Sequence, residues 1–181
     1  MPVAPTKLHL GCGRRHIPGW HHVDLMAYRH VDRVGPAERL DHIADDSVEI
    51  IYASHVLEHF GRYEVFDVVS EWYRVLRTGG ILRVSVPDLS AICRRYLACG
   101  DIREVLGLLV GGQTGPLDCH KTVFDAASLG ELMEDVGFAE VRHYDWRETE
   151  HHFIDDFSQA YLPHMDKRKG LQMSLNVEAV K

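Results

Sequence analysis

The sequence predicts a doubly wound α/β domain with a Rossmann-like, mostly parallel sheet. Short apolar runs rich in β-branched residues recur along the chain, and amphipathic helical patterns lie between them. The first run leads directly into a Gly-Cys-Gly turn. Buried parallel strands appear as continuous apolar runs because both of their faces are covered. Ligands in such folds bind beyond the carboxyl ends of the strands, which is where this turn lies.

Six stretches carry the strand prediction. Four are apolar runs bounded by Gly, Pro or Asp, and two strand-like stretches follow after the alternation with helices has ended. The last two favour a mixed sheet with an antiparallel strand near its carboxyl-terminal end. In chain order the stretches are residues 8–10, 23–25, 48–53, 81–86, 141–144 and 171–177.

Helical periodicity and capping residues predict the elements between the strands. Apolar residues recur at helical spacing from Val65 to Leu76, and similar patterns follow three aspartates. The expected N-caps are Asp88, Asp101 and Asp125, and the expected stops are Gly79-Gly80 and Gly137. Only eight residues separate Gly13 from His22, whereas a crossover takes about a dozen or more. We therefore expect the first crossover to be a loop or a single turn.

The composition predicts one domain over residues 1–181. Apolar residues make up 45% and charged residues 26% of the chain, as is usual in globular proteins, and no linker or repeat divides it. The net charge of −7, from 20 basic and 27 acidic residues, disfavours a nucleic-acid partner. No stretch approaches the roughly 18 apolar residues of a membrane span, and no signal segment opens the chain. We expect a cytoplasmic protein without a membrane partner.

Thirteen histidines require that a metal site be considered. His55-Val-Leu-Glu-His59 matches the His-x-x-Glu-His pattern of inverted zinc peptidases. The short chain and the strand directly before the motif fit a different fold better, so no metal is assigned and a zinc hydrolase is the least favoured function. The pairs His151-His152 and Asp155-Asp156 lack a third ligand of known spacing, and we expect a solvated or partner-facing segment there.

The Gly-Cys-Gly turn of residues 11–13 indicates a nucleotide-like ligand. Glycines at the end of a buried strand allow a sharp turn and the close approach of a ligand. The dinucleotide fingerprint needs a third glycine at the position of His16, which disfavours a nicotinamide enzyme.

Several motifs fall in one order at the predicted strand ends. They are Leu-Gly-Cys-Gly13, the acidic Asp24, Tyr52-Ala-Ser-His-Val-Leu-Glu-His59, and Arg74-Val-Leu-Arg-Thr-Gly-Gly80 leading to Val84-Ser-Val-Pro-Asp88. With these motifs the chain resembles the class I methyltransferases that use S-adenosylmethionine, and in particular a group of small predicted methyltransferases. The resemblance covers residues 7 to about 90 strongly and the remainder loosely.

The resemblance implies S-adenosylmethionine as the cofactor and assigns it a set of residues. The glycine turn passes under the methionine part, and a carboxylate accepts hydrogen bonds from the ribose hydroxyls, since it offers two acceptors to a pair of vicinal donors. Other residues border adenine or form the floor beneath the sulfonium. The implied set is Gly11, Cys12 and Gly13 in the turn, Asp24 at the ribose, Ala37 and Glu38 at adenine, and Ser54 and His55 in the floor.

The chain also departs from the family pattern. His9 stands where the family usually carries an acidic or amide residue, and Pro36 where an aspartate binds the adenine amino group. Proline has no side-chain acceptor, so recognition of adenine would rest on backbone groups. With the first crossover helix shortened, Arg14 or Arg15 is a candidate to hold the cofactor carboxylate.

The expected reaction is methyl transfer to an oxygen, or a nitrogen, of a small molecule, saccharide or carrier-bound intermediate. A hydroxyl acceptor needs a general base, and histidine is the natural base near neutral pH. The candidates are His120, which is favoured because it ends a polar, glycine-rich loop, and His59. A cofactor-binding subunit without activity of its own, dependent on a partner chain, is the alternative, and a homodimer is compatible with the sequence.

Overall fold

The computed structural model describes residues 6–181 and follows the predicted order of strands and helices. The strands of the main sheet are β1 (Lys7–Leu10), β2 (His21–Asp24), β3 (Arg33–Val34), β4 (Val48–Ser54), β5 (Leu76–Pro87), β6 (Glu140–His143) and β9 (Ser174–Val180). The helices are α1 (Val65–Val75), α2 (Leu89–Cys99), α3 (Leu106–Val110) and α4 (Ala126–Val136). A small hairpin pairs β7 (Tyr161–Leu162) with β8 (Leu171–Gln172), and single 3-10 turns are η1 (Leu57–His59), η2 (Ile102–Glu104), η3 (Trp146–Glu148) and η4 (Phe157–Gln159).

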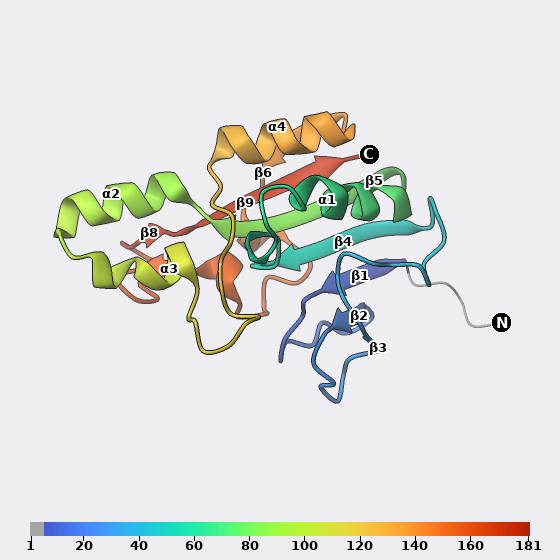
Figure 1. Ribbon diagram of the computed structural model, residues 1–181, viewed down its shortest axis with the longest axis horizontal. Coiled ribbons are helices and arrows are strands. Elements are labelled where there is room, and N and C mark those ends of the chain that lie inside the picture. The colour runs from blue at the N-terminus through green and yellow to red at the C-terminus, as the bar shows by residue number, and fades with distance from the viewer. Residues whose placement is uncertain (1–5) are drawn as a thin grey trace.

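Seven strands form one sheet in the order β3-β2-β1-β4-β5-β9-β6 (Figure 1). All neighbours pair in parallel except β9, which is antiparallel to both β5 and β6. The predicted fold class, a mostly parallel sheet with an antiparallel carboxyl-terminal strand, is confirmed. The chain leaves β1 toward β2 and β3 on one side and returns to β4 on the other, so a crevice is expected between the carboxyl ends of β1 and β4.

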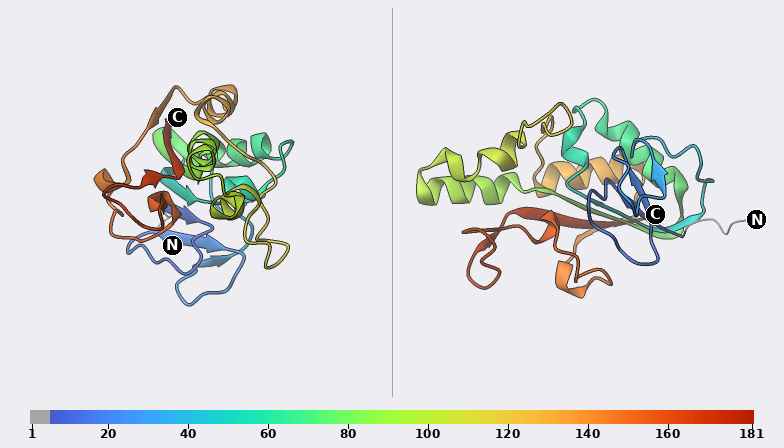
Figure 2. Two further views of the ribbon diagram at one scale, coloured as in Figure 1. Left: turned by 90° about the vertical axis from the view of Figure 1, so that its left-hand side faces the viewer. Right: turned by 90° about the horizontal axis from the view of Figure 1, so that it is seen from below.

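Helices α1 and α4 lie on one face of the sheet, and α2 and α3 lie beyond its end, where α2 packs beside β8 (Figure 2, right). Helix α1 presents five buried residues to the sheet, and α4 packs beside it. These residues join the main hydrophobic core, in which Trp72 is fully buried and donates a hydrogen bond from its indole nitrogen to the carbonyl of Ala37, at 2.8 Å. The loop that carries Ala37 is thereby fixed to the core.

The opposite face is covered without helices. The connection between β1 and β2 is a loop over residues 11–20, as predicted, and the irregular segment 144–173 packs on the same side of the sheet (Figure 2). A second, smaller core forms there from Ile17, Trp20, Ile50 and Tyr52. The hydroxyl of Tyr52 donates to a carboxylate oxygen of Asp156 at 2.6 Å, which ties this segment to the sheet.

Several predicted boundaries shift. Helix α1 ends at Val75, and Leu76 already belongs to β5, so Gly79-Gly80 lies within that strand and does not stop the helix. The stretch 171–177 is divided between the small hairpin and β9. The helix expected after Asp101 is a 3-10 turn followed by the short α3.

The predicted caps are confirmed. Asp88 accepts from the backbone of Ser90 at 2.8 Å, and Asp125 accepts from that of Ser128 at 2.9 Å. Gly137 ends α4 in the left-handed conformation. Among the described residues, no helix has the length and apolar character needed to cross a membrane.

Candidate functional site

Two adjoining cavities open at the carboxyl ends of β1, β2 and β4. One has a volume of about 410 Å³ and is lined by Gly11, Asp24, Ala37, Glu38 and His55, among others. The other has about 170 Å³ and is lined by residues that include Gly11, Cys12, Gly13, Ser54 and His55. The structure therefore brings all eight residues of the expected cofactor set to one crevice, at the place where the order of the strands reverses.

The backbone of the Gly-Cys-Gly turn adopts conformations that favour glycine. Gly11 has φ +58°, and a Cβ there would lie 2.5 Å from Val56 Cγ2. Gly13 has φ +55°, and its N–H donates to a carboxylate oxygen of Asp24 at 2.7 Å. Burial, together with the neighbouring Asp24, raises the pKa of the Cys12 thiol to about 12, so this thiol stays protonated near neutral pH.

Asp24 is fixed at the end of β2 by two backbone donors. One carboxylate oxygen accepts the N–H of Gly13 and the other accepts the N–H of Met26, each at 2.7 Å. Each oxygen keeps a free lone pair, since a carboxylate oxygen accepts two hydrogen bonds. The half-buried carboxylate therefore presents two spare acceptors to the 410 Å³ cavity.

His55 follows β4 in the left-handed conformation, with φ +55°, and borders both cavities. Its Nε2 lies 2.9 Å from the hydroxyl of Ser174, which itself donates to the carbonyl of Phe157 at 2.5 Å. The hydroxyl proton is thus engaged, and Nε2 must be the donor to Ser174. Its Nδ1 lies 3.1 Å from Glu58 Oε1.

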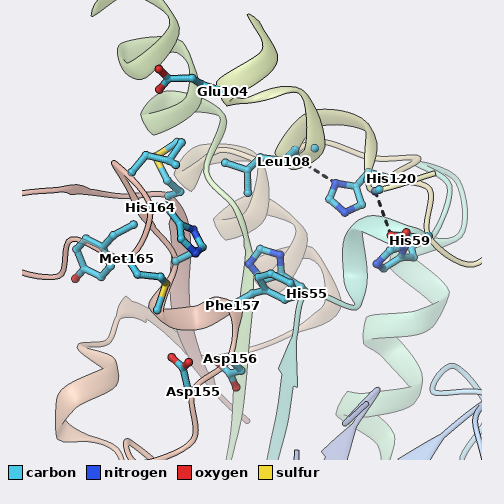
Figure 3. Close-up of a pocket in the computed structure, with 18 of the residues that line it drawn as sticks. His55, His59, Glu104, Leu108, His120, Asp155, Asp156, Phe157, His164 and Met165 are labelled. Carbon is cyan, nitrogen blue, oxygen red and sulfur yellow. Dashed lines mark hydrogen bonds between the residues drawn. The ribbon is translucent and has the colours of Figure 1, made fainter. Parts of the chain in front are cut away.

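A third cavity of about 750 Å³ adjoins the crevice and shares His55 with it (Figure 3). One wall comes from α3 and the loop before His120, and the other from residues 155–173. His59 and His120 lie at one end of this cavity, with ring centroids 5.0 Å apart, and His164 lies at the other end.

Each of these two histidines is oriented by a backbone carbonyl. The Nδ1 of His59 donates to the carbonyl of Cys119 at 3.2 Å, and the Nδ1 of His120 donates to that of Leu108 at 3.0 Å. A carbonyl oxygen only accepts, so both Nδ1 atoms carry protons and the Nε2 atoms are left free. Burial lowers the pKa of His120, against the opposing effect of the Glu58 carboxylate.

The two arginines of the first loop differ in their surroundings. Arg15 lines the 170 Å³ and 750 Å³ cavities, with its Nε donating to the carbonyl of Asp155 at 3.2 Å and its guanidinium over the ring of Phe157. Arg14 is exposed to solvent. Of the two predicted candidates, only Arg15 is placed to reach a ligand in the crevice.

The departure at His9 has a structural reason. The side chain is only 2% exposed and stacks on Tyr52 with ring centroids 5.3 Å apart. Burial, and secondarily the proximity of His22, lowers the pKa of His9 well below its usual value, so the ring is neutral. It belongs to the packing of the helix-free face of the sheet.

Sequence analysis named Glu58 within the His55–His59 motif but did not predict its burial. Glu58 is fully buried behind His55, and no motif indicated that its carboxylate would be isolated from solvent. The expectation of a solvated segment around His151-His152 and Asp155-Asp156 is wrong in part. His151 is 3% exposed and packs on Tyr52, and Asp156 accepts the hydroxyl proton of Tyr52.

Comparison with known proteins identifies relatives of this fold. Residues 18–84 match the profile of a family described as "Methyltransferase domain". A probable S-adenosylmethionine-dependent methyltransferase of Mycolicibacterium smegmatis is 31% identical over 97 residues, which are 53% of this chain and 30% of the relative. The chain thus spans less than a third of the length of that curated protein.

Solved structures agree in fold. An S-adenosylmethionine-dependent methyltransferase of Archaeoglobus fulgidus has a TM-score of 0.60 at 17% identity, covering 98% of this chain and 86% of its own. A Burkholderia thailandensis 1,6-didemethyltoxoflavin N1-methyltransferase, solved with S-adenosylhomocysteine, has a TM-score of 0.58 at 14% identity, covering 98% and 71%. The chain therefore shares its fold with solved S-adenosylmethionine-dependent methyltransferases, and its residues 18–84 match a methyltransferase domain profile.

Proposed function

We propose that this chain binds S-adenosylmethionine in the crevice and transfers its methyl group to an oxygen, or a nitrogen, of a small molecule, saccharide or carrier-bound intermediate. The observation that carries the proposal is Asp24, whose two spare acceptors face a cavity at the strand switch point beside the glycine turn. Vicinal hydroxyls of a ribose match such a pair of acceptors.

The remaining residues suit the other parts of the cofactor. Leu25 and Met26 are half exposed and line the 410 Å³ cavity together with Ala37 and Glu38, so they supply apolar surface for adenine. Arg15 supplies a cation at the 170 Å³ cavity for the carboxylate of the methionine part. With Pro36 in place of an aspartate, backbone groups of this loop must recognise the adenine edge.

S-adenosylmethionine, when bound, supplies an electrophilic methyl group on a sulfonium centre, so that an acceptor lone pair forms the new bond as the carbon–sulfur bond breaks toward sulfur. Positioning and exclusion of water contribute most to such a displacement. Here His55 and Ser54 form the floor where the two cavities meet, and the network from His55 through Ser174 to Phe157 holds that floor in place.

A hydroxyl acceptor must lose a proton. His120 and His59 are the candidates, because each has Nδ1 protonated by its bond to a carbonyl and Nε2 free to accept. The lowered pKa of His120 keeps its ring neutral and able to accept a proton at neutral pH. Both rings border the 750 Å³ cavity, which we assign to the acceptor.

The size of that cavity suits a small-molecule acceptor, and its lining combines apolar and charged side chains. Small-molecule sites measure roughly 300–1,000 Å³, and this one lies within that range. Charged side chains line it from both walls, Arg103 and Glu104 on one and Asp155 on the other. The related fold also serves an N-methyltransferase, so nitrogen stays within the proposal.

The alternative is a cofactor-binding subunit that needs a partner chain, motivated by Pro36, His9 and the missing crossover helix. A zinc hydrolase using His55 and His59 is disfavoured, because Nδ1 of His55 faces Glu58 and its Nε2 donates to Ser174. A homodimer also remains a proposal.

An acceptor screen tests the proposal. The chain is incubated with S-adenosylmethionine and a panel of sugars, phenols and amines, and S-adenosylhomocysteine is measured by mass spectrometry. Turnover on a hydroxylated acceptor, abolished in Asp24→Ala, supports the proposal. Saturable cofactor binding without turnover on any acceptor favours the silent-subunit alternative.

A further inference from the structure

Glu58 is a buried carboxylate without adequate partners. Its side chain is 0% exposed, and neither carboxylate oxygen receives a hydrogen bond from the described residues. The nearest ring nitrogens are His55 Nδ1, at 3.1 Å but outside hydrogen-bond geometry, and His120 Nε2, at 4.0 Å. Burial of an ionised carboxylate costs several kcal/mol unless a cation or strong donors compensate.

The two histidines beside Glu58 add lone pairs. Their Nδ1 protons are held by the carbonyls of Cys119 and Leu108, so the free Nε2 atoms carry no proton in the neutral rings. Metal-binding histidines in proteins are usually oriented in this way, by a second bond from the other ring nitrogen.

The carboxylate and the two imidazoles lie close to one another. One ligand atom each from Glu58, His59 and His120 lie within 4.8 Å of one another. Ligand atoms around a tetrahedral ion at about 2.1 Å are about 3.4 Å apart, so small rotations of the rings close the gap. Three lone-pair atoms with no donor among them repel one another unless a cation or a donor lies between them.

We propose that Glu58, His59 and His120 bind one divalent transition-metal ion at the junction of the crevice and the 750 Å³ cavity. Two imidazoles and one carboxylate are ligands typical of Zn²⁺, Fe²⁺ and Mn²⁺, and they leave coordination positions open. His59 borders both cavities and His120 borders the larger one, so the open positions face the acceptor.

This inference extends the proposed function and rests on it for its role in catalysis. A bound ion lowers the pKa of a coordinated hydroxyl, whose proton then passes to water in the open cavity. The oxygen keeps its lone pair for the methyl carbon. When the ion is bound, His59 and His120 act as its ligands, and this role replaces the general-base role proposed for them in the metal-free chain.

Metal binding is tested on the full chain, freed of metal with a chelator and titrated calorimetrically with Zn²⁺ and then with Mn²⁺. We expect one ion per chain, and a loss of affinity of at least about 100-fold in Glu58→Gln and in His120→Gln. The matched control is His164→Gln, a histidine at the other end of the same cavity, which must bind as the wild type does.

Thermal unfolding of the same samples separates loss of ligands from loss of fold. Zn²⁺ must raise the melting temperature of the wild type and of His164→Gln, but not that of Glu58→Gln or His120→Gln. Less than one tenth of an ion per chain, or equal binding by all variants, overturns the proposal. If S-adenosylhomocysteine still binds to that metal-free protein, the metal site is refuted and the proposed function stands.

Discussion

Replacement of Asp24 by asparagine removes the feature on which the proposed cofactor site depends. Both carboxylate oxygens accept a backbone N–H at 2.7 Å, from Gly13 and from Met26. An asparagine amide has one oxygen and one NH₂ group, so the NH₂ must face one of these donors. One acceptor for the ribose is lost as well, while the volume of the side chain is unchanged.

The magnitude follows from the bonds lost. A hydrogen bond to a charged group contributes about 1.5–3 kcal/mol. Loss of one such bond to a ribose hydroxyl therefore weakens binding about 10- to 100-fold, at about 1.4 kcal/mol per tenfold. We expect this increase in the Kd for S-adenosylhomocysteine in Asp24→Asn, measured by calorimetric titration.

Asp32→Asn is the matched control. Asp32 accepts the backbone N–H of His22 at 2.8 Å at the same edge of the sheet, yet it lines none of the three cavities. Asp32→Asn should lower the free energy of unfolding but leave the Kd for S-adenosylhomocysteine unchanged. A Kd for Asp24→Asn within about threefold of the wild type, or an equal loss in both variants, refutes the reasoning.

Three further predictions follow. Gly11→Ala should lose about 1–3 kcal/mol of unfolding free energy in denaturant titrations, because its φ is +58° and a Cβ would lie 2.5 Å from Val56 Cγ2; a change below 0.5 kcal/mol, roughly, contradicts this. Arg15→Gln should bind S-adenosylmethionine about 10-fold more weakly but 5′-methylthioadenosine, which lacks the carboxylate, unchanged, whereas Arg14→Gln should match the wild type for both ligands. Burial lowers the pKa of His151 from 6.5 to about 4, so its contribution to stability is fully present above pH 6.5 and is lost as the pH falls toward 4. His151→Phe should reduce the acid-induced loss of unfolding free energy by roughly 3 kcal/mol over this window, and an unchanged pH profile would exclude the buried, neutral ring.

The sequence predicted well those parts of the fold that local patterns determine. The glycine turn, the strand before His55 and the caps Asp88 and Asp125 all depend on short-range constraints: φ angles, alternation of buried residues and local hydrogen bonds. The missing first crossover helix was also predictable, because a crossover that includes a helix takes about a dozen residues or more and only eight separate Gly13 from His22.

The remaining features of the fold and the site depend on tertiary contacts, which local sequence patterns do not reveal. The segment 144–173 reads as polar, yet His151 is buried because the helix-free face of the sheet offers Tyr52 and Trp20 as partners. Likewise, Glu58 and His59 are separated from His120 by some 60 residues, and only the path of the loop before His120 brings them together. Sequence analysis assigned no metal to these residues, and that prediction stays untested.

The binding of cofactor to the wild-type chain tests the central claim most directly. We would titrate the metal-free protein calorimetrically with S-adenosylmethionine and with S-adenosylhomocysteine. The proposed site predicts saturable binding of both, with one ligand per chain. The absence of binding at millimolar concentrations of either ligand would contradict it, and would leave the methyltransferase fold without its cofactor in the isolated chain.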